Sequence, residues 1–133
     1  MKHWTFMDYV LPNGNNPVRK WYTKELSADE QADIDVLLGT LENAKTWKQP
    51  VYKSLSGNAQ GLGEIRWRGS NGRPLRLIGF HSPVGNKFTI LIGCTHDGKK
   101  YQPPEAMSSA ISRKRDLERN RGSICEHDFE KTD

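Results

Sequence analysis

The sequence lacks a long apolar run and has little cysteine. Its longest mainly apolar stretch covers residues 88–93, far below the ~18–20 residues that cross a bilayer. The first ten residues are mixed and polar at both ends, so no signal peptide is predicted. Two cysteines, Cys94 and Cys125, are too few for a disulfide framework and suit a reducing compartment. These absences predict a cytoplasmic protein that does not enter a membrane.

The charge of the chain is unevenly distributed. Residues 1–44 carry four Lys/Arg against seven Asp/Glu, residues 45–121 carry fifteen against five, and residues 122–133 carry one against four. An ordinary solvated surface accounts for such counts as well as a binding face does. Here the basic residues occur in predicted strands and loops as well as on a helix, which favours a face that binds a polyanion, most simply RNA.

The N-terminal third reads as a strand followed by two helices. Residues 4–10 alternate and are aromatic, as strands are. Asn16 and Pro17 supply an N-cap and a first helical residue for a short helix ending at Leu26. Ser27 and Glu30 form a capping box for a second helix. Its apolar stripe consists of Ile34, Leu37, Leu38, Leu41 and Ala44.

The rest of the chain predicts a long loop over 47–61, three strands, and a helix. The strands cover 62–68, 74–81 and 87–96, and the short turns between them indicate an antiparallel meander. Pro103 and Pro104 open a last helix that ends near Arg119. On the third strand one face is predicted to hold Phe88, Ile90, Ile92, Cys94 and His96.

The predicted fold class is therefore α+β: an N-terminal strand and a helical hairpin packed on a three-stranded antiparallel meander, with a C-terminal helix. One domain is expected over residues 3–119, which suits a chain of 133 residues. Residues 120–133 are expected to be a polar, flexible tail.

Several short motifs occur in an order known from one toxin superfamily. They are Leu11-Pro-Asn-Gly-Asn-Asn-Pro-Val18 followed by Trp21, Lys53-Ser-Leu-Ser-Gly57, Gly63-Glu-Ile-Arg66, Leu75-Arg-Leu-Ile-Gly-Phe80, and Lys99-Lys-Tyr-Gln-Pro-Pro-Glu-Ala106 with Arg113. In order and spacing they resemble the RelE/ParE superfamily, specifically its phage-derived, HigB-like branch. The resemblance runs from Trp4 to about Arg119.

The resemblance implies a RelE-like mixed sheet on the N-terminal helices and a cognate antitoxin, often of the helix-turn-helix type. It implies a type II toxin that acts as a ribosome-dependent, metal-independent mRNA endonuclease without a cofactor. The ParE branch offers an alternative, a non-catalytic toxin that inhibits DNA gyrase. A plain nucleic-acid-binding module is the third possibility.

Two arginines on adjacent predicted strands are the leading catalytic candidates. Cleavage of RNA by its own 2′-hydroxyl passes through a dianionic phosphorane, and the planar guanidinium fork suits phosphate oxygens. Arg66 and Arg76 also match the family's functional basic positions. The alternative is that they are surface residues paired with acids, of which Glu64 is nearby.

Further candidates surround this pair in the predicted fold. Lys99 and Lys100, between the last strand and the helix, match the family's basic signature, and the adjacent Tyr101 can orient the 2′-oxygen or stack on a base. Lys53 in its glycine-flanked loop can bind the RNA backbone. The remaining basic residues of the first hairpin that are expected to bind RNA are Arg68 and Arg73.

The proton carriers are predicted from the histidines that end two strands. His96 is the catalytic candidate and His81 an RNA-binding one, because imidazole titrates near neutral pH. The sequence departs from the family here, since the family's histidine lies one position nearer the N-terminus and Asp97 takes the place of a phenylalanine. Either histidine is also compatible with a structural role.

Two Cys-x-His pairs suggest a different chemistry. The pairs are Cys94-Thr-His96 and Cys125-Glu-His127, four potential zinc ligands. Cysteines of tetrahedral zinc sites are usually two to four residues apart, which these are not. No metal is therefore predicted, although zinc remains the alternative for these residues.

Overall fold

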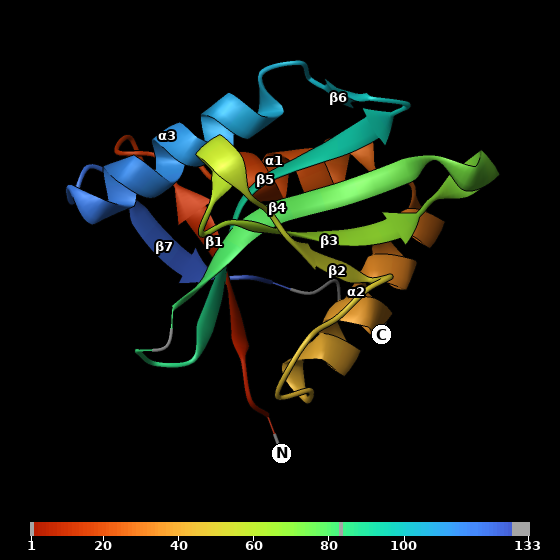
Figure 1. The fold of residues 1–133 in the computed structure, drawn as a ribbon, viewed down its shortest axis with the longest axis horizontal. Helices are drawn as coiled ribbons and strands as arrows, with labels where there is room; N and C mark the ends of the chain where they lie inside the picture. The colour runs from red at the N-terminus through yellow and green to blue at the C-terminus, as the bar shows by residue number, and fades with distance from the viewer. Residues whose placement is uncertain (1, 83, 129–133) are drawn as a thin grey trace.

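The computed structural model describes residues 2–82 and 84–128, which form an α+β structure (Figure 1). In chain order its elements are β1 (Thr5–Val10), α1 (Pro17–Glu25), α2 (Ala28–Glu42), β2 (Tyr52–Ser54), β3 (Gly63–Arg68), β4 (Pro74–Ser82), β5 (Lys87–Asp97), β6 (Lys100–Gln102), α3 (Ala106–Glu118) and β7 (Ser123–Glu126). Short 3₁₀ turns occupy Gly57–Ala59 and Ser70–Gly72.

The predicted meander is the centre of a larger sheet. The strand order is β2-β3-β4-β5-β1-β7, and β6 pairs with β5. β1 runs parallel to β5, whereas the other pairs are antiparallel. The three-stranded sheet predicted from the sequence is therefore too small: β2 lies within the predicted loop, β6 follows the third predicted strand, and β7 lies in the predicted tail. All three missed strands are three or four residues long, too short for alternation to reveal them.

The two N-terminal helices begin where the sequence predicts. The Asn16 side chain accepts a hydrogen bond from the Arg19 amide at 2.8 Å, and Pro17 takes the first helical position. Ser27 and Glu30 form the reciprocal capping box. The hairpin turn between β3 and β4 also follows its sequence signal, since Asn71 adopts φ 58° and Gly72 φ 74°.

The helices lie on opposite faces of the sheet. On one face Trp21 of α1 packs so closely over Gly93 that a Cβ there would lie 2.1 Å from the indole. On the other face the Lys114 ammonium of α3 lies over the Phe80 ring, and Arg113 lies over Tyr9. The second face is called the α3 face below. The core under α1 and α2 is filled by Phe6, Ile34, Leu38, Ile65, Leu75 and Phe88.

A β-bulge on β5 contradicts the prediction that five alternating residues share one face. The pairs Phe88–His81 and Ile90–Gly79 lie before the bulge, and Ile92–Ile78 and Cys94–Arg76 lie after it. Paired residues point to the same side of a sheet, whereas consecutive residues of β4 point to opposite sides. The extra residue, Leu91, thus leaves Phe88 and Ile90 facing the N-terminal helices and turns Ile92, Cys94 and His96 to the α3 face.

The C-terminal segment is a strand where the sequence predicts a flexible tail. β7 pairs with β1, placing Cys125 opposite Asp8. His127 Nδ1 lies 2.7 Å from Asp8 Oδ1, and both side chains are buried. A buried carboxylate needs such a partner, which explains why the polar segment is held against the sheet. Residues 129–133 of the predicted tail lie outside the described residues.

The helices of residues 2–82 and 84–128 are all too short or too polar to cross a bilayer.

Candidate functional site

A buried carboxylate brings the two predicted catalytic arginines together on the α3 face. Glu64 of β3 is 3% exposed. Its Oε1 accepts from Arg66 Nε at 2.8 Å and lies 2.6 Å from Arg66 Nη2, and Arg76 Nε lies 3.7 Å away. Strand alternation places Glu64 and Arg66 on one face, and register sets Arg66 directly opposite Arg76. Two guanidinium groups therefore share one negative charge.

Tyr101 and His96 complete the cluster from the β5–β6 hairpin. The Tyr101 hydroxyl donates to Glu64 Oε2 at 2.8 Å, and the His96 ring lies 4.7 Å from the Tyr101 ring. Burial and the Glu64 carboxylate raise the pKa of Tyr101 well above its usual value, so the hydroxyl remains a donor. Burial lowers the pKa of Arg76, although Glu64 opposes this effect. We call Glu64, Arg66, Arg76, His96 and Tyr101 the Glu64 cluster.

Two more predicted basic residues extend the same face. Lys53 of β2 is exposed and pairs in register with Glu64, so its side chain leaves the sheet on the α3 face. Arg68 is exposed at the end of β3, two residues after Arg66, and its Nη1 donates to Gly72 O at 3.1 Å. The predicted side chains on β2, β3 and β4 thus form one basic surface.

Lys99 and Lys100 are not brought into the cluster. Both are exposed at the β5–β6 turn. Lys100 pairs with Asp97 while Tyr101 pairs with His96, and consecutive residues of a strand point to opposite sides. Lys100 therefore leaves the hairpin on the side away from Tyr101.

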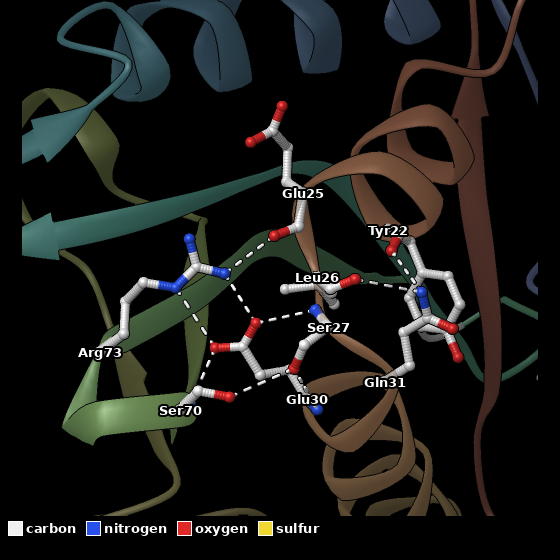
Figure 2. Close-up of polar contacts among 8 residues, drawn as sticks. All are labelled: Tyr22, Glu25, Leu26, Ser27, Glu30, Gln31, Ser70 and Arg73. Atoms are coloured by element: carbon white, nitrogen blue, oxygen red, sulfur yellow. Dashed lines mark hydrogen bonds and ion pairs between the residues drawn. The ribbon is translucent and has the colours of Figure 1, made fainter.

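Arg73, which was predicted to bind RNA, is bound by Glu30 at the start of α2 and is not part of the Glu64 cluster. Figure 2 shows its guanidinium on Glu30, with Nε 3.2 Å from Oε2 and Nη2 2.7 Å from Oε1. Nη2 also donates to Glu25 O at 2.8 Å, and Glu30 accepts from the amides of Ser27 and Ser70, each at 2.9 Å. The arginine joins the β3–β4 turn to the start of α2.

Burial alone would raise the pKa of Glu30, but these hydrogen bonds more than offset it. The Arg73 guanidinium and the Ser27 and Ser70 amides hold the pKa at about 2. Glu30 therefore stays ionised, and its negative charge keeps Arg73 in place. We call Glu30, Arg73 and the two amides the Glu30 clasp.

His81 lies on the opposite face, which contradicts its predicted place beside the basic residues. Its ring packs among Trp47 at 4.4 Å, Trp4 at 4.5 Å, Phe88 at 4.8 Å and Tyr52 at 5.5 Å between centroids. Burial lowers the pKa of His81, so the neutral imidazole is favoured. His81 thus packs against aromatic side chains and lies away from the Glu64 cluster.

A hollow of about 310 Å³ opens beside the arginines. The residues that line it are Pro50, Val51, Arg66, Trp67, Arg68 and Arg76. Three of the six are arginines, and none is acidic. The hollow is therefore suited to an anion with an apolar part.

The two Cys-x-His pairs do not form a zinc site. Cys94 is buried opposite Arg76, and burial raises the pKa of its thiol to about 12. Cys125 and His127 lie beside Asp8 on the other side of β1. Within residues 2–82 and 84–128, no three Cys, His, Asp or Glu side chains are grouped as metal ligands would be. The zinc alternative is not supported for these residues.

From the sequence Glu64 is only a possible ion-pair partner of Arg66 and Arg76, whereas the structure places it at the centre of the cluster. Alternation already put it on the face of Arg66 and Arg68. The missing information was its contact with Tyr101, 37 residues away in sequence, which requires the strand β6 that the sequence does not reveal.

Comparison with protein-family models, with curated proteins and with solved structures finds no match to this chain.

Proposed function

We propose that this chain is a toxin of the type II kind that cleaves mRNA on the ribosome, in the cytoplasm and without a metal. The observation that carries the proposal is the convergence of Arg66 and Arg76 on Glu64, beside Tyr101 and His96. The order of motifs that resembles the RelE/ParE superfamily supplies the ribosome and the message as partners.

The chemistry requires cations where negative charge develops. The 2′-hydroxyl oxygen attacks the adjacent phosphorus, the bond to the 5′-oxygen breaks, and a 2′,3′-cyclic phosphate remains. Arg66 engages Glu64 through Nε and Nη2, which leaves Nη1 as a donor for a phosphate oxygen. Arg76 contributes a second guanidinium from the neighbouring strand. Glu64 fixes both groups before substrate arrives, and such preorganised cations are often a large part of catalysis.

Proton transfer falls to His96 in this proposal. His96 is half-buried at the edge of the cluster, next to the Tyr101 ring. The imidazole can take the proton of the 2′-hydroxyl while water protonates the departing 5′-oxygen, or it can protonate the 5′-oxygen while water takes the proton of the 2′-hydroxyl. Tyr101 donates its one hydroxyl hydrogen to Glu64, so it can meet the 2′-hydroxyl only as an acceptor and otherwise contributes its ring.

The test is a cleavage assay with translating ribosomes and a defined message, read by primer extension. The proposal predicts breaks within the translated part of the message. An intact transcript under conditions in which the protein blocks gyrase supercoiling would instead favour the ParE-like alternative. Binding of RNA without either effect would favour the plain nucleic-acid-binding module.

The antitoxin is also part of the proposal. An exposed basic surface on β2 and β3, represented by Lys53 and Arg68, invites an acidic cover. We expect a small helix-turn-helix protein to be encoded beside this chain and to co-purify with it. Isolation of the active chain alone from its native host during normal growth would contradict this expectation.

A further inference from the structure

The hollow beside Arg66 and Arg76 has features that simple phosphate binding does not require. Its volume of about 310 Å³ lies at the lower end of the usual range for small-molecule pockets. Its lining joins arginines from β3 and β4 to Pro50 and Val51, which precede β2. An apolar wall would add nothing to the binding of a phosphate ion alone.

The polar side of the hollow has a donor that Glu64 does not use. Arg66 engages Glu64 through Nε and Nη2, which leaves Arg66 Nη1 for a ligand oxygen. Arg76 adds a second guanidinium, whose Nη1 donates to Leu75 O at 2.9 Å and whose buried Nε lies 3.7 Å from Glu64 Oε1. A ligand oxygen on Arg66 Nη1 would meet both positive charges. Glu64, the acid that balances the arginines, does not line the hollow. The surface presented to a ligand is therefore cationic.

The other side of the hollow can hold a ring. Pro50 is exposed and Val51 half-buried, and Val51 is fixed by its carbonyl, which accepts from the Arg66 amide at 2.8 Å. Arg68 is exposed, and its Nη1 donates to Gly72 O at 3.1 Å, which holds the guanidinium while one face of its plane can stack on a base. A base against these residues would lie within one nucleotide of a phosphate on Arg66 and Arg76.

We propose that this hollow binds a single nucleotide of RNA, with its phosphate on Arg66 and Arg76 and its base against Pro50, Val51 and Arg68. The inference depends on the proposed function in one respect, namely that the nucleotide belongs to RNA. It adds that the chain recognises one nucleotide by itself, away from the ribosome. The nucleotide is the one whose 3′-phosphate is attacked, because the same arginines are assigned to the scissile phosphate.

The test is a calorimetric titration of the full chain with nucleoside 3′-monophosphates and, separately, with inorganic phosphate. The preferred nucleotide is expected to bind roughly tenfold or more tightly than inorganic phosphate, as a stacked base adds affinity. Val51→Phe, which fills the hollow, should remove this advantage and leave inorganic phosphate binding unchanged. Val51→Ala is the matched control and should retain most of the advantage.

A second variant guards against misfolding of Val51→Phe. Arg68→Gln changes an exposed side chain and should weaken nucleotide binding while preserving the melting temperature. Arg119→Gln, also exposed but outside the hollow, should leave both nucleotide binding and the melting temperature unchanged. Equal affinity for nucleotide and phosphate, or nucleotide binding unaffected by Val51→Phe and Arg68→Gln, would overturn the inference. Nucleotide binding by a chain that leaves messages uncut would uphold the inference and reject the proposed endonuclease.

Discussion

Glu30 and Glu64 are both buried glutamates that bind arginine, and they differ in what remains available around them. In the Glu30 clasp one arginine and two backbone amides converge on the carboxylate, and the same guanidinium also donates to Glu25 O (Figure 2). In the Glu64 cluster two arginines share one carboxylate beside a hollow without acids. The first arrangement neutralises its charges, whereas the second keeps an excess of positive charge.

This comparison separates arginines that the sequence makes equivalent. Arg66, Arg68, Arg73 and Arg76 lie within eleven residues and all were predicted to act on RNA. The structure commits Arg73 to a joint between α2 and the β3–β4 turn, and leaves the other three around the hollow. The number of cations for each buried carboxylate thus distinguishes a structural arginine from a candidate functional one.

The largest expected effect comes from removing an arginine of the Glu64 cluster. We expect Arg76→Ala to lower the rate of message cleavage by about 10²–10³-fold, the usual loss when one preorganised donor to a developing oxyanion is removed. Primer extension on translating ribosomes measures the rate. Arg119→Ala removes an equal charge from an exposed position and should leave cleavage unchanged. Equal losses in both variants would mean that net charge, rather than the cluster, drives the activity.

Changes in the Glu30 clasp should lower the stability of the fold and leave the cleavage activity unchanged. Glu30→Gln leaves Arg73 without its ion pair, and because Arg73 is partly exposed we expect a loss of about 2–3 kcal/mol in the free energy of unfolding. Urea denaturation measures it. Asp29→Asn, an exposed neighbour in the first turn of α2, should cost no more than about 1 kcal/mol. Cleavage per folded molecule should not change in either variant.

The clasp also predicts how stability depends on pH. The folded pKa of Glu30 is about 2, below its ordinary value of 4.5, so the unfolded chain binds more protons between these values. The contribution, about 3 kcal/mol, is complete above pH 4.5 and disappears as the pH falls toward 2. Denaturation curves across this range should show the loss in the wild type and a smaller slope in Glu30→Gln. Identical slopes would contradict the depressed pKa.

A smaller effect is expected for the hydroxyl that joins β6 to the Glu64 cluster. Tyr101→Phe leaves Glu64 Oε2 without its donor, which should cost about 1–2 kcal/mol of stability. The alkaline absorbance titration of phenolate measures this contact. Because the pKa of Tyr101 is raised, the wild type and Tyr101→Phe should differ in phenolate absorbance only in strongly alkaline solution. Loss of a component near the ordinary tyrosine value would contradict the contact with Glu64.

The smallest effect is expected on the far face. His81→Phe keeps a ring among Trp4, Trp47 and Tyr52 and should leave RNA cleavage unchanged. The same primer-extension assay measures it. A loss comparable to that of Arg76→Ala would place the active surface on the wrong side of the sheet.

Local signals predicted much of this fold, and contacts distant in sequence account for what was missed. The caps at Asn16 and Ser27 and the Asn71–Gly72 turn depend on neighbouring residues, and each appears where expected. The bulge at Leu91 depends on how β5 meets β4, so no alternation pattern in one strand reveals it. β7 forms because β1 has a free edge and Asp8 needs a partner. The polar sequence of residues 120–128 does not by itself predict a strand there.

The candidate site was predicted in the same uneven way. Register placed Arg66 opposite Arg76, as adjacent predicted strands suggested. The structure places Arg73 and His81 outside the Glu64 cluster, because a carboxylate 43 residues away binds the first side chain and aromatic rings on the opposite face pack around the second. The carboxylate and most of the rings that contact Arg73 and His81 are distant in sequence, so residue type alone could not show that these two side chains lie outside the cluster.

The most direct test compares the wild type with Arg66→Ala/Arg76→Ala on a translated message, after both proteins are shown to be folded by their melting curves. The account predicts that the wild type leaves fragments ending in a 2′,3′-cyclic phosphate and that the double variant leaves the message whole. Cutting by the double variant at the wild-type rate would contradict it.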